Sequence, residues 1–249
     1  MIKQEIQMVR SLGEKRVRSE MGLFIAEGEK FIGELIDSPL KVRKVYVTES
    51  SDVGEQFEGS CEVEWISDKE MERISQLKSA NSSLALVEMP RYTLKADELN
   101  GRLTLALDGV QNPGNLGTII RLADWFGIRD IICSPTCADC FNPKVVQATM
   151  GAILRVRIHY TDLVPLLSKI DLPIYGALLE GDNIYNRELQ SEGVLVMGSE
   201  GQGLSPEVEA LINERLYIPT FATDNLGSES LNVAIATAII CSEFRRRDL

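Results

Sequence analysis

The sequence predicts an α/β protein whose larger part holds a parallel sheet. Apolar strand-like runs alternate with helical segments from about residue 100 to the end, and strands that alternate with helices pair in parallel and are covered on both faces. With 249 residues, of which 44% are hydrophobic and 25% charged, the chain has the composition of a globular protein with a sizeable core. The predicted strands are 103–107, 130–133, 156–160, 174–179, 194–197 and 216–218, and the predicted helices are 117–126, 143–150, 162–168, a segment after 205–206 and a long one from 231.

The first 90 residues show a separate and smaller α/β pattern. After it, a segment rich in charge and proline, 89–98, interrupts the periodicity and is predicted to be a linker. We therefore expect two domains, residues 1–92 and residues 100–249. The elements predicted for the first domain are helices 2–12 and 23–37 and strands 42–47, 63–66 and 83–87.

The charge is unevenly distributed along the chain. A formal net charge of −11 argues against tight, non-specific binding of nucleic acid. Residues 1–44 nevertheless hold nine Lys or Arg against seven Asp or Glu, with basic clusters at Lys15–Arg18 and Lys41–Lys44. A nucleic acid is therefore expected to meet this region first, although solvated helix and strand faces explain the clusters equally well.

We expect a cytoplasmic protein without membrane contact. The longest apolar run, Val233–Cys241, is too short to span a membrane, and the first thirty residues carry charges throughout, unlike a secretion signal. Cys61 and Cys241 lie far apart in the sequence and fit buried thiols of a reducing compartment.

Three polar segments follow apolar runs in the larger domain: Asn115–Arg121, Met197–Gly203 and Ser230–Ala236. Open α/β sheets bind ligands at such strand ends. A dinucleotide-binding fold is disfavoured, because the segment after the first strand, 108–117, lacks the G-x-G-x-x-G spacing. Taken singly, 109–114 would be a turn, Asn115 a helix N-cap, Glu200 a solvated acid and Ser230 the cap of the last helix.

In their order, the three segments resemble the signature motifs of the SpoU/TrmH family of RNA ribose 2′-O-methyltransferases, in the SPOUT class. The resemblance covers roughly residues 100–245. It implies a C-terminal SPOUT domain with a parallel sheet and a trefoil knot, S-adenosylmethionine as cofactor, and structured rRNA or tRNA as substrate. Segments Val9–Arg18, Phe24–Lys30 and Val45–Thr48 resemble, more loosely, a small L30e-like α/β domain that binds the RNA substrate.

The resemblance also implies the site residues. Arg121 matches the family's essential arginine; since a guanidinium keeps its proton, we expect it to grip an RNA phosphate and stabilise developing charge rather than act as a base. We expect no metal, because methyl transfer needs chiefly alignment and removal of the hydroxyl proton. The expected polar positioning residues are Asn115, Glu200, Ser230 and Asn232, and the expected cofactor-binding residues are Met197, Gly198, Gly203, Ile218, Pro219 and Leu231.

The resemblance further implies a homodimer. In this family two C-terminal domains pack through their first and last helices, here 117–125 and 232–244, so that the arginine of one chain lies beside the cofactor of the other. Apolar and small residues are frequent in both segments, which is weak support because part of each must face the domain's own sheet.

Two alternatives stay open. Cys133, Cys137 and Cys140 have the C-x₃-C-x₂-C spacing of radical enzymes that bind an Fe–S cluster. The chain could also be an RNA-binding protein of the same fold without catalysis. Two departures from the family pattern bear on this second alternative: Ser79–Ser83 stands where Pro-Gln-Gly is frequent, and the segment 220–229 before the third motif is longer than usual. His159, the single histidine, has no apparent catalytic partner.

Overall fold

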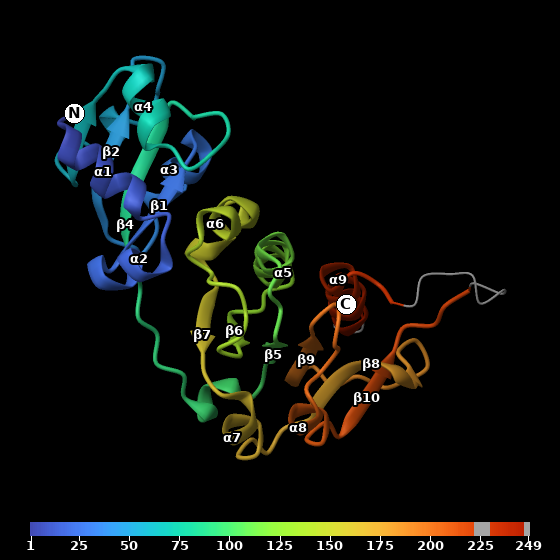
Figure 1. Ribbon diagram of the computed structural model, residues 1–249. Coiled ribbons are helices and arrows are strands. Elements are labelled where there is room, and N and C mark those ends of the chain that lie inside the picture. Colours follow the sequence, from blue (N-terminus) through green and yellow to red (C-terminus); the bar gives the residue numbers. More distant parts are fainter. Residues whose placement is uncertain (222–229, 247–249) are drawn as a thin grey trace. The chain divides into compact units, whose positions relative to one another are not determined.

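The structure is a computed structural model that describes residues 1–221 and 230–246 (Figure 1). The chain divides into two compact units. Unit 1 comprises Met1–Arg91 together with Asp139–Arg155, and unit 2 comprises Tyr92–Ala138 together with Val156–Leu249. A segment from the middle of the chain thus belongs with the N-terminal residues.

Unit 1 is built on a four-stranded sheet in the order β1-β4-β2-β3. Strands β1 and β2 are antiparallel to β4, and β2 is parallel to β3. The elements of unit 1 are α1 Lys3–Ser11, α2 Lys15–Met21, β1 Leu23–Glu27, α3 Glu29–Leu35, β2 Val42–Val47, η1 Glu55–Phe57, β3 Glu62–Trp65, α4 Asp68–Ile74, β4 Ser83–Glu88, α6 Pro143–Thr149 and η3 Ala152–Leu154.

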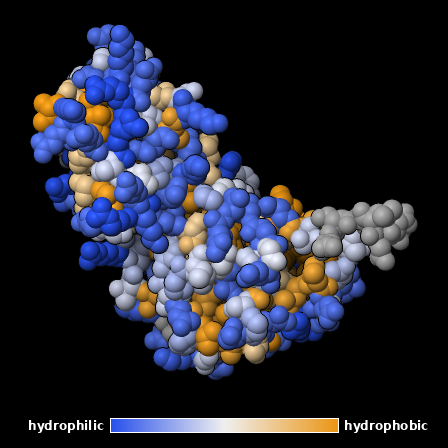
Figure 2. Space-filling view, viewed as in Figure 1, coloured by the Kyte–Doolittle hydropathy of each residue, from blue (hydrophilic) through white to orange (hydrophobic). Residues whose placement is uncertain are grey.

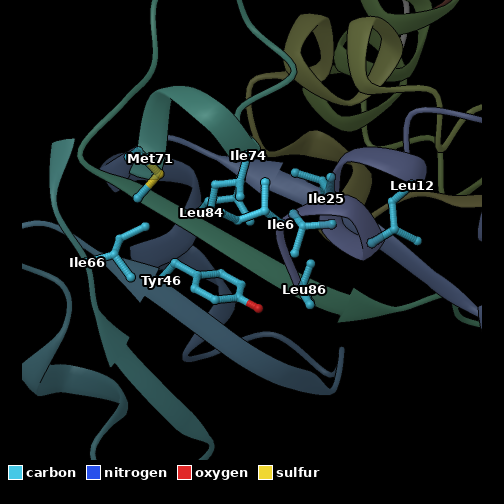
Figure 3. Packing of buried hydrophobic residues seen from close by; sticks show 10 residues of the cluster. Ile6, Leu12, Ile25, Tyr46, Ile66, Met71, Ile74, Leu84 and Leu86 are labelled. Carbon is cyan, nitrogen blue, oxygen red and sulfur yellow. The ribbon is translucent and has the colours of Figure 1, made fainter. Parts of the chain in front are cut away.

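Helices α1 and α4 pack together and cover one face of this sheet, where the buried side chains of both point toward strand residues such as Tyr46 and Leu84 (Figure 3). Successive strand residues point to opposite faces, so Phe24 faces away from its neighbour Ile25. Its ring lies 4.9 Å from that of Phe141, between centroids. The segment 139–155 therefore packs on the second face of the sheet.

The single helix predicted over 23–37 is wrong. Residues Leu23–Glu27 form β1, paired with β4 along its whole length, and helix α3 begins only at Glu29. Between them Gly28 has a φ of 104°, which an α-helix cannot contain. The apolar run of β1 is buried from both sides, so it lacks the alternation that distinguishes a strand from a helix in the sequence.

Arg18 is almost fully buried, with 1% of its surface exposed. Its guanidinium donates to the carbonyl oxygens of Leu12 and Gly13, at 2.7 and 2.8 Å, and to the Asp139 carboxylate at 2.5 Å. This ion pair joins α2 to the segment that begins at Asp139.

Most cations of the two basic clusters form ion pairs within unit 1, although Lys41 and Arg43 remain more than half exposed. Besides the buried Arg18, Lys41 and Arg43 pair with Glu88, and Lys44 lies within 2.7 Å of three carboxylates. Partial burial alone would lower the pKa of the Lys44 ammonium, but its hydrogen bonds to these carboxylates outweigh burial and raise the pKa. Hydrophilic residues cover most of the face drawn in Figure 2, with apolar residues in scattered groups.

Replacing Arg18 with leucine is expected to lower the free energy of unfolding by about 3–5 kcal/mol, because Asp139 would keep its charge in a site that is only 13% exposed. Urea denaturation measures this effect. Arg16→Leu is the matched control, since Arg16 pairs with Glu20 on the surface and its removal should cost no more than about 1 kcal/mol. Equal losses in the two variants would contradict a structural role for the buried pair.

Unit 2 contains a six-stranded sheet in the order β10-β8-β9-β5-β6-β7, and every neighbouring pair is parallel. This confirms the predicted α/β class with a parallel sheet. The elements of unit 2 are η2 Ala96–Leu99, β5 Leu103–Asp108, α5 Pro113–Trp125, β6 Asp130–Cys133, β7 Arg157–Tyr160, α7 Leu163–Leu167, β8 Ile174–Asn183, β9 Gly193–Gly198, α8 Pro206–Glu209, β10 Glu214–Tyr217 and α9 Val233–Arg246. Among the described helices, none combines the length and the apolar character that crossing a membrane requires.

Helices α5 and α9 pack side by side and run in the same direction. Asn115 in the first turn of α5 is bonded to Asn232 just before α9, and at the other ends Arg245 Nε donates to the Phe126 carbonyl at 2.8 Å. Helix α5 begins four residues earlier than predicted, because Asn112 caps it and Pro113 occupies its first position. The packing of these two helices brings Asn115, which follows β5, next to Asn232, which follows β10 in the chain.

Candidate active site

The three predicted segments converge at the carboxyl ends of β5 and β9. These strands are neighbours in register, with Asp108 opposite Gly198. The first segment begins α5 after β5, the second follows β9, and the third precedes α9. Since β9 separates β5 from β8, the chain order reverses at this point, which is where parallel sheets place their ligands.

A hydrogen-bonded row of side chains links all three segments. Asn115 donates through Nδ2 to Glu200 Oε1, and its Oδ1 accepts from Asn232 Nδ2 at 3.1 Å. Asn232 Oδ1 accepts from the backbone amides of Ala234 and Ile235, at 2.9 and 3.3 Å, and so caps α9. The capping alternative for Asn115 is wrong, because Asn112 caps α5 and leaves Asn115 to bond across the site.

The loop after β9 is closed on itself. Ser199 and Gly203 exchange two backbone hydrogen bonds of 2.9 and 3.0 Å, and Gly203 has a φ of 70°. A Cβ on Gly198 would lie 2.5 Å from the Gly203 carbonyl oxygen, whereas Gly201 has open space around it. The end of the loop is held by Asp108, whose Oδ2 accepts from both the backbone amide and the hydroxyl of Ser205 at 2.7 Å.

Arg121 is exposed two turns along α5 from Asn115. Six residues of helix place the two side chains on different faces, and Glu200 contacts Asn115 rather than Arg121. Within the described part of the chain, no hydrogen bond or ion pair holds the guanidinium. Ser230, exposed as well, lies two residues before Asn232.

The residues expected to bind the cofactor lie at the end of β9, directly after β10 and just before α9. Met197 is buried at the end of β9, and Ile218 and Pro219 are half-buried directly after β10. Leu231 exposes 48% of its surface, a large fraction for a leucine beside a cluster of polar groups. The unusual loop of the third motif falls mostly on residues 222–229, which lie outside the described residues.

The cysteine alternative has no geometric support. Cys133, Cys137 and Cys140 are buried, and the Cys137 thiol donates to the Leu107 carbonyl at 3.2 Å. Hydrogen bonding with Cys133 lowers the pKa of Cys137 to about 6, although burial opposes this shift. In the residues that the structure describes, no three His, Cys, Asp or Glu side chains are grouped so that they could hold a metal ion.

His159 belongs to a polar cluster with Asp130 and Arg157, which lies at the opposite edge of the sheet from the three motifs. Its Nε2 lies 2.8 Å from Asp130, which also binds Arg157 and stands at the amino end of β6, the edge opposite the site.

Sequence reasoning missed Asp108 and Asn112 as supports of the site. The Asn-Pro pair at 112–113 is a helix-start signal that could have identified Asn112, whereas nothing in the sequence paired Asp108 with Ser205.

The parallel α/β unit carries three motifs at the carboxyl edge of its sheet, and comparison with known proteins places the chain in the class of S-adenosylmethionine-dependent RNA methyltransferases. The family model for the SpoU rRNA methylase family matches residues 102–242, and the chain belongs to this family. A model described as an MRM3-like substrate binding domain matches residues 3–85.

Similar proteins cover nearly the whole chain. The 23S rRNA (guanosine(2553)-2′-O)-methyltransferase RlmP of Bacillus subtilis is 29% identical over 97% of this chain and 96% of its own. A solved structure from Porphyromonas gingivalis, described as an RNA methyltransferase of the TrmH family, is 40% identical, with a TM-score of 0.87 over 99% of both chains. An AdoMet-bound rRNA methyltransferase from Sinorhizobium meliloti is 29% identical, with a TM-score of 0.89 over 99% of this chain and 96% of that one. The family, the class of enzyme and the cofactor expected from the sequence are confirmed.

Proposed function

We propose that this protein transfers the methyl group of S-adenosylmethionine to a ribose 2′-hydroxyl of ribosomal RNA. The observation that carries the proposal is the hydrogen-bonded row Glu200–Asn115–Asn232, which joins the three family motifs at one edge of the sheet. The relatives named as 23S rRNA methyltransferases favour ribosomal over transfer RNA. Their substrate also favours the cytoplasm as the place of action.

The loop residues fit the cofactor. The tight approach of Gly198 to Gly203 leaves backbone groups rather than side chains at the strand end, as binding of an adenosine moiety requires. Leu231 and Ile218 offer apolar surface, and Leu231 would be covered by a bound ligand. Met197, Gly198, Gly203, Ile218, Pro219 and Leu231 would hold S-adenosylmethionine, which supplies an electrophilic methyl group when bound.

The polar residues divide the remaining tasks. Arg121 is exposed and projects its planar fork to solvent, so it is placed to bind the phosphate beside the target ribose and to stabilise charge as the hydroxyl loses its proton. Asn115, Asn232 and Glu200 position the loop, and Ser230, which is exposed two residues before Asn232, would contribute a hydroxyl. A fixed arrangement of this kind lowers the barrier chiefly by alignment.

The finer features of the fold belong to the same proposal. In unit 2, β9 lies between β5 and β8, and α9 returns from the edge strand β10 to pack beside α5, as passage of the chain through a trefoil knot would require. In unit 1, a mixed four-stranded sheet with helices packed on it is compatible with an L30e-like domain that binds the RNA substrate. Residues 1–92 would therefore hold the RNA and 100–249 would perform the methyl transfer.

We also propose that the active form is a homodimer built on α5 and α9. Among the apolar residues of these helices, Ile119, Ile120, Ala123 and Phe244 are buried within the chain, whereas Trp125 is 83% and Ile235 53% exposed. A two-fold interface reuses one patch on both chains, and covering these two side chains would bring Arg121, which lies one turn before Trp125, close to the partner subunit.

Ile235→Glu is expected to convert the protein to a monomer and to abolish most methyl transfer. Ile235 is a better test position than Ile239 in the same helix, because Ile239 is partly buried within its own chain. Light scattering measures the assembly, and Leu179→Glu is the control, since Leu179 is 69% exposed and belongs to β8 rather than to α5 or α9. A monomeric Ile235→Glu variant with full activity would exclude a catalytic role for the dimer.

The proposed function is tested by incubating the protein with S-adenosylmethionine carrying a labelled methyl group and with ribosomal RNA from cells that lack the gene. Mass mapping should place the label on one ribose. An RNA-binding protein without catalysis would bind the RNA but neither bind S-adenosylmethionine nor transfer the label.

A further inference from the structure

The row of side chains at the carboxyl edge has a fixed direction. The backbone amides of Ala234 and Ile235 can only donate, so the Asn232 atom that faces them is the oxygen Oδ1. The amide nitrogen of Asn232 must then face Asn115, whose Oδ1 accepts the bond at 3.1 Å. This leaves the amide nitrogen of Asn115 to donate to Glu200.

We propose that Asn232 and Asn115 are positioning residues whose matched donors and acceptors connect the α9 N-terminus to Glu200, which accepts in the wild type and fixes the loop Ser199–Gly203. The consequence for cofactor binding rests on the proposed function. The hydrogen-bonded row itself exists without any ligand.

Asparagine is required at both positions because each side chain must donate and accept at once. Asn232→Asp still caps α9, since aspartate is an equally good N-cap, but it presents an acceptor to Asn115. Asn115→Asp still accepts from Asn232, but it presents an acceptor to Glu200. Glu200→Gln alone is tolerated by the row, because a glutamine oxygen accepts as a carboxylate does.

The same Glu200→Gln change should suppress both aspartate variants. Combined with Asn115→Asp, it supplies an amide nitrogen that donates to the new carboxylate. Combined with Asn232→Asp, it allows the Asn115 amide to turn over, so that Asn115 donates to the new aspartate and accepts from the new glutamine. Each double variant therefore restores a complete row, in the second case with its direction reversed.

The experiment measures the dissociation constant of S-adenosylhomocysteine by calorimetry, and the unfolding midpoint Tm, for the full chain and these variants. Asn115→Asp and Asn232→Asp should each weaken binding about tenfold, the effect of one lost hydrogen bond to a charged group. Addition of Glu200→Gln should return both to within about twofold of the wild type. Failure of Glu200→Gln to suppress either defect would overturn the proposal.

Glu200→Ala is the control that separates the row from simple charge repulsion. It removes the same charge but cannot donate, so the double variants that carry Glu200→Ala should stay about tenfold weaker than those that carry Glu200→Gln. Equal recovery with alanine and glutamine would refute the directional row. If the wild type binds no S-adenosylhomocysteine, the proposed function fails, and the same pattern of suppression in Tm then decides whether the row exists.

Discussion

Arg121→Ala is expected to reduce methyl transfer by a factor of at least about 10²–10³ while leaving the affinity for S-adenosylmethionine within about twofold of the wild type. The magnitude is that of removing one group that stabilises transition-state charge. Cofactor affinity should persist because the guanidinium is exposed on α5 and forms no hydrogen bond or ion pair with the loop after β9 within the described residues. Turnover with labelled cofactor and calorimetry on the same preparations measure the two quantities.

Two further variants define the role of this arginine. Arg121→Lys should also be poor, because an ammonium cannot reproduce the bidentate fork that matches a phosphate. Arg129→Ala, which removes another exposed arginine of the same unit, should leave turnover nearly unchanged. A near-normal rate for Arg121→Ala would refute the assignment, and parallel losses in turnover and cofactor affinity would indicate a role in building the loop instead.

Gly198→Ala is expected to weaken S-adenosylmethionine binding about 10- to 100-fold. The expected loss comes from a steric clash within the protein itself, not from a clash with the ligand. The new Cβ would lie 2.5 Å from both the carbonyl oxygen of Gly203 and the amide nitrogen of Leu204, so this backbone must move. Overpacking of this kind typically costs about 1–3 kcal/mol. Gly198→Val, which adds a larger side chain at the same crowded position, should be at least as damaging.

Gly201→Ala is the matched control for this effect. It adds the same methyl group to the same loop, but at a position with no atom within 4 Å, so cofactor affinity should change little. Calorimetry on the two alanine variants decides the point. Equal affinities would show that the closed turn between Ser199 and Gly203 is not needed for binding.

Several elements could be predicted from local pattern because their chemistry is local. The helices and strands of unit 2 alternate over the predicted segments, and the parallel sheet follows from that alternation. The short helix α4 also carries a local sequence signal, the capping box of Ser67 and Glu70. Strand β1 could not be distinguished from a helix, since its residues are buried on both faces.

The candidate site was predicted as a set of motifs, and these motifs are adjacent in space. Their connections were not predicted. The structure pairs Glu200 with Asn115, because Asn112 caps α5 and leaves the Asn115 side chain to bond across the site. Within the basic cluster Lys15–Arg18, a distant carboxylate, Asp139, pairs with the buried Arg18, whereas Lys15 and Arg16 stay exposed.

By itself the sequence determined the α/β class, the family and the three segments that form the site, since periodicity and motif order are properties of neighbouring residues. Only the tertiary structure decided which polar groups face each other: Asp108 with Ser205, Arg18 with Asp139, and Glu200 with Asn115. These partners are 85 to 121 residues apart, two of the three pairs reaching from one strand end to another. The physical reason is that burial and strand order select such contacts, and neither is encoded in the local spacing of side chains.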